Sequence, residues 1–158
     1  MTRFDLQGGD CDPDVFRVAA HEAGHAIATV LSGLQVLEIK IWWTSRTDFG
    51  GFVRTADYDT TDRDLLNGSL TTSMAGHEAE GLWLTRYQNF SSHRAALRTY
   101  RASCEHDLRL FREERRLGKA LLTETAARAR AHSQLIAHWH RVERLVDRLV
   151  RTRHLTTV

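Results

Sequence analysis

Two histidines and one glutamate near the N-terminus have the residue types and the spacing of a metallopeptidase site. His21 and His25 are one helical turn apart, so on a helix both imidazoles face the same side and can bind one metal ion. Zinc binds neutral imidazole and lowers the pKa of a bound water to about 7. Glu22 follows the first histidine, where its carboxylate can accept the proton of that water. The pattern therefore predicts zinc ligands at His21 and His25 and a general base at Glu22.

The residues around this pattern predict the helix that it requires. Asp12 is a good N-cap residue, and Pro13 follows it at the first helical position. Apolar residues then recur at helical spacing as far as Leu34, and Ser32-Gly33 marks the expected end of the helix. Gly24 inside the helix costs about 0.8–1 kcal/mol relative to alanine, so we expect another backbone or a substrate to approach there. The alternative is an ordinary helix with two surface histidines.

Length and composition indicate one domain that is large enough to bury a core. The chain has 158 residues, a formal net charge of +2 and 20 arginines against 2 lysines. Acidic residues are interspersed among the arginines, which favours solvated helix faces over a nucleic-acid partner. No stretch approaches the ~20 apolar residues of a membrane span, and the N-terminus has no secretory signal. Cys11 and Cys104 make no disulfide framework, which favours a reduced, cytoplasmic setting.

The remaining patterns predict a mainly α-helical domain with a small β hairpin or edge-strand element, over residues 13–155, after an N-terminal tail of residues 1–12. Alternating apolar residues predict a strand over Gln35–Trp42, and a second extended run follows Gly50-Gly51. Such an edge strand can add an extended peptide; equally, the two strands can serve only to cover the core. Three further helices are expected, over Leu65–Thr85, from after Ser92 to about Leu117, and over Lys119–Arg151.

Asp107 is the candidate for the third metal ligand. It lies three residues after Cys104 and four before Phe111, so on a helix its carboxylate shares their apolar side. An ionised carboxylate is costly to bury unless it is paired or binds a metal. Because the chain already offers two zinc ligands, we favour metal binding by Asp107, and a buried ion pair with an arginine is the alternative.

Three segments, taken in order, resemble the peptidase domain of the FtsH-type membrane AAA proteases: His21–Ile27 (HEAGHAI), Met74-Ala75-Gly76 with Ala79-Glu80, and Asp107-Leu108 within a helix. That family carries HEAGH, a small-residue segment that ends in Ala-Glu, and a Gly-Ala-x-Asn-Asp-Leu segment whose aspartate completes the zinc site. The resemblance covers about residues 13–155. It implies a helical zinc-metallopeptidase domain, with His21, His25 and Asp107 as zinc ligands and Glu22 as the general base.

The resemblance also implies roles for two further parts of the chain. Glu80 matches a family glutamate close to the metal site, which makes it a partner of a ligand or, as the runner-up, a ligand itself. Gly50, Gly51, Phe52 and Val53 lie in the segment that matches the strand along which substrate peptides bind.

Several residues depart from the family pattern. Ser103-Cys104-Glu105-His106 replaces Gly-Ala-x-Asn before the aspartate, so His106 and Cys104 are alternative ligands, although we expect His106 to face away and Cys104 to lie in the core. His77 replaces an arginine, and we expect it on a helix surface. The remaining histidines show no ligand spacing and are expected on solvated faces: His93, His132, His138, His140 and His154.

These patterns lead to one expected function and two alternatives. We expect a soluble, cytoplasmic zinc metalloendopeptidase that cleaves flexible segments without ATP, because the sequence lacks a nucleotide-binding loop and a membrane helix. Its expected partners are a peptide or protein substrate and a separate unfoldase or regulator. We expect it to bind neither nucleic acid nor a membrane. The alternatives are a catalytically inactive zinc-binding regulatory module and a hydrolase for a specialised small peptide or amide.

Overall fold

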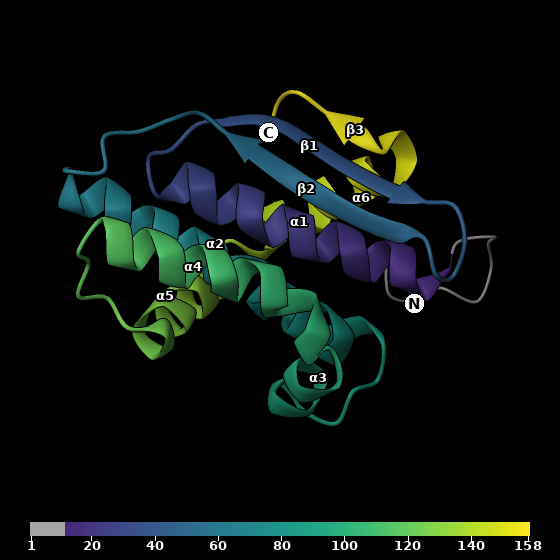
Figure 1. Cartoon of the computed structure of the whole chain (residues 1–158). Helices are drawn as coiled ribbons and strands as arrows, with labels where there is room; N and C mark the ends of the chain where they lie inside the picture. Colours follow the sequence, from purple (N-terminus) through teal and green to yellow (C-terminus); the bar gives the residue numbers. More distant parts are fainter. Residues whose placement is uncertain (1–11) are drawn as a thin grey trace.

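A computed structural model of the chain describes residues 12–158 (Figure 1). Helix α1 (Pro13–Leu31) lies between a small antiparallel sheet and helix α2 (Arg63–Tyr87). The sheet consists of β1 (Val36–Trp43), β2 (Phe49–Thr55) and β3 (His154–Leu155), and the other helices are α3 (His93–Thr99), the short 3-10 helix η1 (Arg101–Cys104), α4 (Glu105–Leu117), α5 (Glu124–Ala137) and α6 (Trp139–Thr152). The expected mainly α fold with a small β element is confirmed. Of the expected N-terminal tail, residues 1–11 lie outside the described residues, and Cys11 with them.

Helix α1 begins and ends where the sequence predicts. The Asp12 carboxylate accepts a hydrogen bond from the Asp14 backbone N–H (3.0 Å), and Pro13 occupies the first turn. Gly33, with a φ of +76°, follows the last turn in the left-handed region. Small side chains allow this helix to be covered on both sides, and five of its alanines are fully buried: Ala19, Ala20, Ala23, Ala26 and Ala28.

Gly24 is a point of close approach between α1 and α2. A Cβ at this position would lie 2.4 Å from the Ala79 Cβ and 2.5 Å from the Ala75 carbonyl oxygen. Because only glycine lacks a Cβ, it alone leaves room for the two helices at this contact. The expectation that another backbone approaches Gly24 is confirmed, and that backbone belongs to α2.

The sheet has the strand order β2-β1-β3, and both strand pairs are antiparallel. Among the described residues, β2 pairs on one side only, so it is an edge strand. It begins at Phe49, so the two glycines expected to precede the extended run belong to the strand itself. The two-residue strand β3 pairs with β1 at Ile39 and Lys40, and no pattern in the sequence predicts it.

Two helical stretches that the sequence predicts to be continuous are broken. The stretch that ends at Leu117 divides at Tyr100 into α3, η1 and α4. The last stretch begins only at Glu124, capped by Thr123, and divides at His138 into α5 and α6. Tertiary packing accounts for the second break, because α5 packs against α2 whereas α6 packs against α1. One straight helix would not cover both surfaces.

Two clusters of buried apolar side chains stabilise this arrangement. The larger cluster joins α1, α2, β1, α5 and α6, and Trp83 of α2 is fully buried within it. The smaller cluster lies between α2, α4 and α5 and includes Leu66, Phe111 and Ala127. No helix within residues 12–158 combines the length and the apolar character needed to cross a membrane.

The substitution Gly24→Ala is expected to lower the free energy of unfolding by roughly 1–2 kcal/mol net. The added methyl group would overlap the Ala75 carbonyl oxygen, a backbone atom, so the two helices would have to move apart. The better helix propensity of alanine offsets only part of this cost. Denaturation in guanidinium chloride measures the change, and Ser133→Ala on the exposed face of α5 is the control, with an expected change within about 0.5 kcal/mol. Equal stability of Gly24→Ala and wild type would contradict the close contact.

Candidate metal centre

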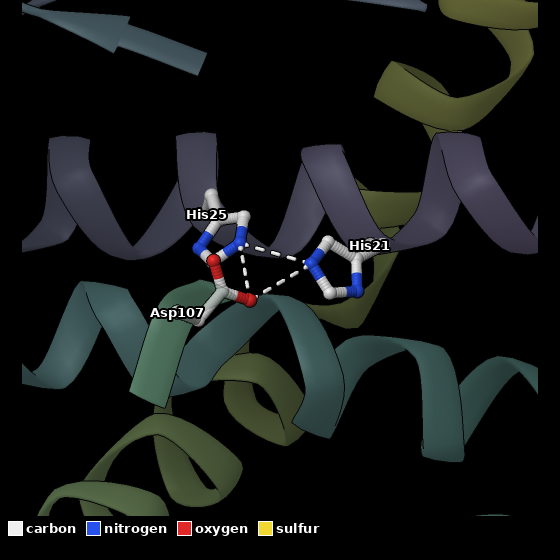
Figure 2. A group of neighbouring side chains, drawn as sticks. All are labelled: His21, His25 and Asp107. Atoms are coloured by element: carbon white, nitrogen blue, oxygen red, sulfur yellow. Dashed lines mark hydrogen bonds and ion pairs between the residues drawn. The ribbon is translucent and has the colours of Figure 1, made fainter. Parts of the chain in front are cut away.

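Three side chains from α1 and α4 direct their ligand atoms at one place (Figure 2). His21 Nε2 lies 3.1 Å from His25 Nε2 and 3.1 Å from Asp107 Oδ2, and 3.4 Å separates His25 Nε2 from the same oxygen. Tetrahedral zinc with bonds of about 2.0–2.1 Å to nitrogen and oxygen places its ligand atoms about 3.3 Å apart. The three atoms therefore have the spacing of three corners of a tetrahedral site, and together they could hold a metal ion.

The Nδ1 atom of each imidazole, which faces away from the centre, has a partner that fixes the orientation of the ring. His25 Nδ1 donates a hydrogen bond to the Thr72 backbone carbonyl oxygen (2.8 Å). Because a carbonyl oxygen only accepts, Nδ1 carries the proton and Nε2 keeps its lone pair for a metal. His21 Nδ1 lies 3.1 Å from Glu80 Oε2, a carboxylate that orients this ring in the same way. Partners of this kind are usual for histidines that bind metals in proteins.

Glu80 lies behind His21 and not among the atoms that face the centre. Its buried carboxylate accepts hydrogen bonds from Arg17 Nη1 (2.5 Å) and Ser103 Oγ (2.5 Å) in addition to its contact with His21. Arg17 is itself buried, and its guanidinium stacks over the Tyr100 ring at 4.4 Å from the centroid. The sequence leads us to expect Glu80 either to be a ligand or to be the partner of one. Its contacts with His21, Arg17 and Ser103 fit the second role, in which it orients His21.

Gly76 of α2 forms the floor of the centre. A Cβ at this position would lie 2.3 Å from His25 Nε2 and 2.6 Å from His21 Nε2. Any side chain here would therefore displace the two nitrogen atoms that face the metal position.

Asp107 reaches the centre from the first turn of α4, and its neighbours in the sequence do not. Its carboxylate is largely buried between the two imidazoles. His106 is exposed, and its Nδ1 lies 3.0 Å from Arg109 Nη2. Cys104 is buried, and its Sγ donates to the Arg101 carbonyl oxygen (3.1 Å). Among the residues that the structure describes, three could therefore act as ligands at this centre, and neither His106 nor Cys104 joins them.

The centre is electrostatically suited to a cation. Burial lowers the pKa of His21, but hydrogen bonds with Asp107 and Glu80 outweigh burial and raise this pKa well above its usual value. Burial raises the pKa of Asp107, but the neighbouring imidazoles outweigh burial and hold this pKa well below its usual range. Both shifts favour a positive charge on the imidazole and a negative charge on the carboxylate, an electrostatic environment that suits a metal cation.

Glu22 lies beside the metal ligands and packs against strand β2. Its side chain is buried, and a Cβ at Gly51 would lie 2.5 Å from Glu22 Cγ and 2.7 Å from Oε1. The missing side chain of Gly51 thus provides the space that this carboxylate occupies. Burial raises the pKa of Glu22 above its usual value, although the two imidazoles act in the opposite direction.

A cleft of roughly 890 Å³ contains the metal centre and runs along β2. One wall of the cleft includes the four residues expected to bind substrate: Gly50, Gly51, Phe52 and Val53. Its other wall includes Leu110 and Leu117 of α4, the helix that carries Asp107. The structure therefore brings the expected peptide-binding strand and the expected metal ligands into one cleft.

Two expectations about the other histidines are wrong. His77 is buried, not on the helix surface, and its Nε2 has no hydrogen-bond partner among the described residues. His93 and His132 do not lie separately on solvated faces; with Glu78 they form a second group of potential metal ligands. These three residues come from three helices, so no spacing in the sequence reveals the group. The one local signal is that Glu78 has buried apolar residues four positions before and after it.

Comparison with known proteins does not assign the chain to a family. No protein-family model matches it, and no curated protein matches it either. The resemblance carried by the three motifs therefore stays a prediction.

The substitution Glu80→Gln is expected to weaken metal binding by about 10- to 100-fold, the usual effect of losing a residue that orients a ligand. A neutral amide removes the negative charge behind His21 and the ion pair with Arg17. Competition with a chelating dye measures the affinity. The matched control is Glu143→Gln, which removes a carboxylate that accepts from the Tyr87 hydroxyl and is not part of the centre. Equal metal affinities for the two variants would contradict the assigned role.

Proposed function

We propose that the chain is a zinc metallopeptidase that hydrolyses peptide bonds in flexible or unstructured segments without ATP. The observation that carries this proposal is the convergence of His21, His25 and Asp107 on one position, with the Glu22 carboxylate buried beside it. Two imidazoles and one carboxylate form a ligand set that zinc uses in catalytic sites, where a fourth position stays open. The resemblance of the motifs to the FtsH-type peptidase domain supports the same four residues.

In this proposal the chain's own residues orient the ligands and transfer protons. A metal ion in the centre would polarise the scissile carbonyl and lower the pKa of a water molecule. Glu22 accepts a proton from the attacking water and delivers it to the leaving amine nitrogen. The buried Glu22 carboxylate lies beside the ligands, against Gly51 of β2. Glu80 and the Thr72 carbonyl keep both Nε2 atoms directed at the centre.

Strand β2 is the proposed binding site for the substrate backbone. As an edge strand it has outer backbone groups that can pair with an extended peptide. Apolar side chains line the cleft beside it, among them Phe52 and Leu110, which are 38% and 43% exposed. We therefore expect extended segments with apolar side chains to be the preferred substrates. A folded substrate would need a separate unfoldase.

Two features of the centre favour an enzyme over a binding module. Within residues 12–158, three protein ligands and not four converge at this site, which is typical of catalytic zinc rather than of a closed structural site. A structural site also has no need of a buried carboxylate at the position of Glu22. The cleft continues along β2 as far as Thr55, and this length favours a peptide over a small amide as the substrate.

The substitution Glu22→Gln is expected to abolish most turnover and to leave the metal in place. Glutamine has nearly the same shape but does not accept a proton, so the rate should fall by about 10²- to 10⁴-fold. Cleavage of fluorescein-labelled casein measures turnover, and elemental analysis of the same samples measures zinc. The control is Glu38→Gln, which removes a carboxylate on β1 that pairs with Arg54 outside the cleft. Wild-type turnover by zinc-loaded Glu22→Gln would contradict the mechanism.

The substitution Gly51→Ala tests the contact between the general base and β2. The new methyl group would force the Glu22 side chain to move, and a misplacement of about 1 Å can lower kcat by about 10²-fold. Zinc content should stay at the wild-type level, because the three atoms nearest to the added methyl group all belong to Glu22 and not to a ligand. Arg54→Ala, on the same strand but outside the cleft, should keep the wild-type kcat. An unchanged kcat for Gly51→Ala would show that Glu22 is not held at this position.

A further inference from the structure

A second cluster of metal-ligand side chains lies where three helices meet. Glu78 comes from α2, His93 from the start of α3, and His132 from α5. Glu78 Oε2 lies 2.7 Å from His93 Nε2 and 3.3 Å from His132 Nδ1, and all three ligand atoms lie within 4.8 Å of one another. The cluster therefore offers the same donor set as the first centre, two imidazole nitrogens and one carboxylate oxygen.

The two pairs of histidines have nearly the same mutual geometry. The rings of His93 and His132 lie 4.8 Å apart between centroids with an interplanar angle of 64°. The corresponding values for His21 and His25 are 4.8 Å and 72°. In the first centre the two Nε2 atoms face each other (Figure 2), whereas in the second cluster His93 Nε2 and His132 Nδ1 both face Glu78 Oε2.

The surroundings of the cluster fix two of its three ligands. Glu78 is 4% exposed, and its other oxygen, Oε1, accepts a hydrogen bond from Arg128 Nη1 (3.2 Å), so Oε2 is left to face both imidazoles. His93 packs against Gly81, where a Cβ would lie 2.7 Å from the His93 Cε1 atom. His93 Nδ1 is buried without a hydrogen-bond partner among the described residues, so packing directs Nε2 at Glu78. The side chain of His132 is 34% exposed, which leaves this imidazole room to turn toward an ion.

Local charge also allows a cation at this position. Arg128 pairs with Glu124 as well as with Glu78, so one positive charge serves two carboxylates. Glu78, Glu124 and Arg128 together carry one net negative charge, which favours a cation at the cluster. Imidazole with carboxylate suits a divalent ion of the zinc type.

The cluster is separate from the first centre. Gly76 and Glu80 on one face of α2 contact His21, whereas Glu78 and Gly81 on the other face contact His93. In Figure 1, α3 and α5 lie on the side of α2 that is away from the sheet. An ion bound to the cluster would therefore share no ligand with His21, His25 and Asp107.

We propose that Glu78, His93 and His132 bind a second divalent metal ion of the zinc type, which joins α2, α3 and α5. This site has three protein ligands, as the first centre does, so its role is inferred from their positions: they come from three helices, and a bound ion would tie the short helix α3 to two longer ones. From α3 the chain continues through η1 to α4, the segment that carries Ser103 and Asp107. The second ion thus supports the segment that completes the first centre.

Zinc stoichiometry in matched variants tests this proposal. The full chain and its variants are stripped with a chelator, reloaded with Zn²⁺, freed of excess by gel filtration and measured by elemental analysis. We expect two zinc ions per chain for wild type, one for His132→Gln, one for His25→Gln and none for the double variant. His140→Gln, an exposed histidine on α6, should retain two. Because His132 is partly exposed, its variant should fold, which circular dichroism checks.

Each outcome separates the second site from the first. The proposal would be overturned if wild type held one zinc ion, His132→Gln also held one and His25→Gln held none. It would also be overturned if wild type and His132→Gln both held two zinc ions. If wild type held one zinc ion, His25→Gln also held one and His132→Gln held none, the second site would be supported and the proposed catalytic centre contradicted. As a second readout, Zn²⁺ should raise the Tm of His25→Gln but not that of the double variant.

Discussion

The close contact between α1 and α2 is the interaction on which the candidate site depends. Gly24 of α1 touches the α2 backbone at Ala75, and Gly76 of α2 leaves the space in which both imidazoles of α1 lie. A larger residue at either glycine would separate the helices or displace the ligands. The same contact brings Glu80 of α2 behind His21, so one packed surface sets both the position of the ligands and their orientation. Close helix packing and metal-site geometry are therefore one constraint.

Buried charge is the second property that shapes the site. Ionised groups are costly to bury unless they are paired, and here the pairs form a connected chain. Arg17 neutralises Glu80, Glu80 orients His21, and His21 faces Asp107. The shifts in pKa of His21 and Asp107, in opposite directions, describe a position that needs a positive charge to complete it. A divalent cation could interact with both imidazoles and the carboxylate at once, which a single proton does not do.

The parts of the fold and site that depend on local pattern could be predicted from the sequence. The N-cap at Asp12, the one-turn spacing of the two histidines and the apolar phase of Asp107 are all properties of single helices. Asp107 lies on the apolar side of its helix, as predicted, although the expected helix breaks at Tyr100. The prediction survives the break because Asp107 and Phe111 both lie in α4. An arginine does form a buried ion pair near the site, but its partner is Glu80, a residue whose role came only from the resemblance.

Features that depend on tertiary contacts could not be predicted in this way. The break at His138 follows from the need to cover two different surfaces with α5 and α6. The pairing of β3 with β1 joins segments more than a hundred residues apart. The cluster of Glu78, His93 and His132 likewise draws one residue from each of three helices, so no periodicity connects its members. The buried position of His77 has the same origin, since helix α2 is covered on several sides.

Anomalous X-ray diffraction at the zinc absorption edge, from crystals of the zinc-loaded chain, tests the central claim most directly. The account predicts an anomalous peak between His21 Nε2, His25 Nε2 and Asp107 Oδ2, at about 2.0–2.2 Å from each atom, with a fourth position that no protein atom fills. Absence of a peak at this position would contradict the claim that these residues form a metal centre. A peak with a fourth protein ligand would contradict the claim that the centre is catalytic.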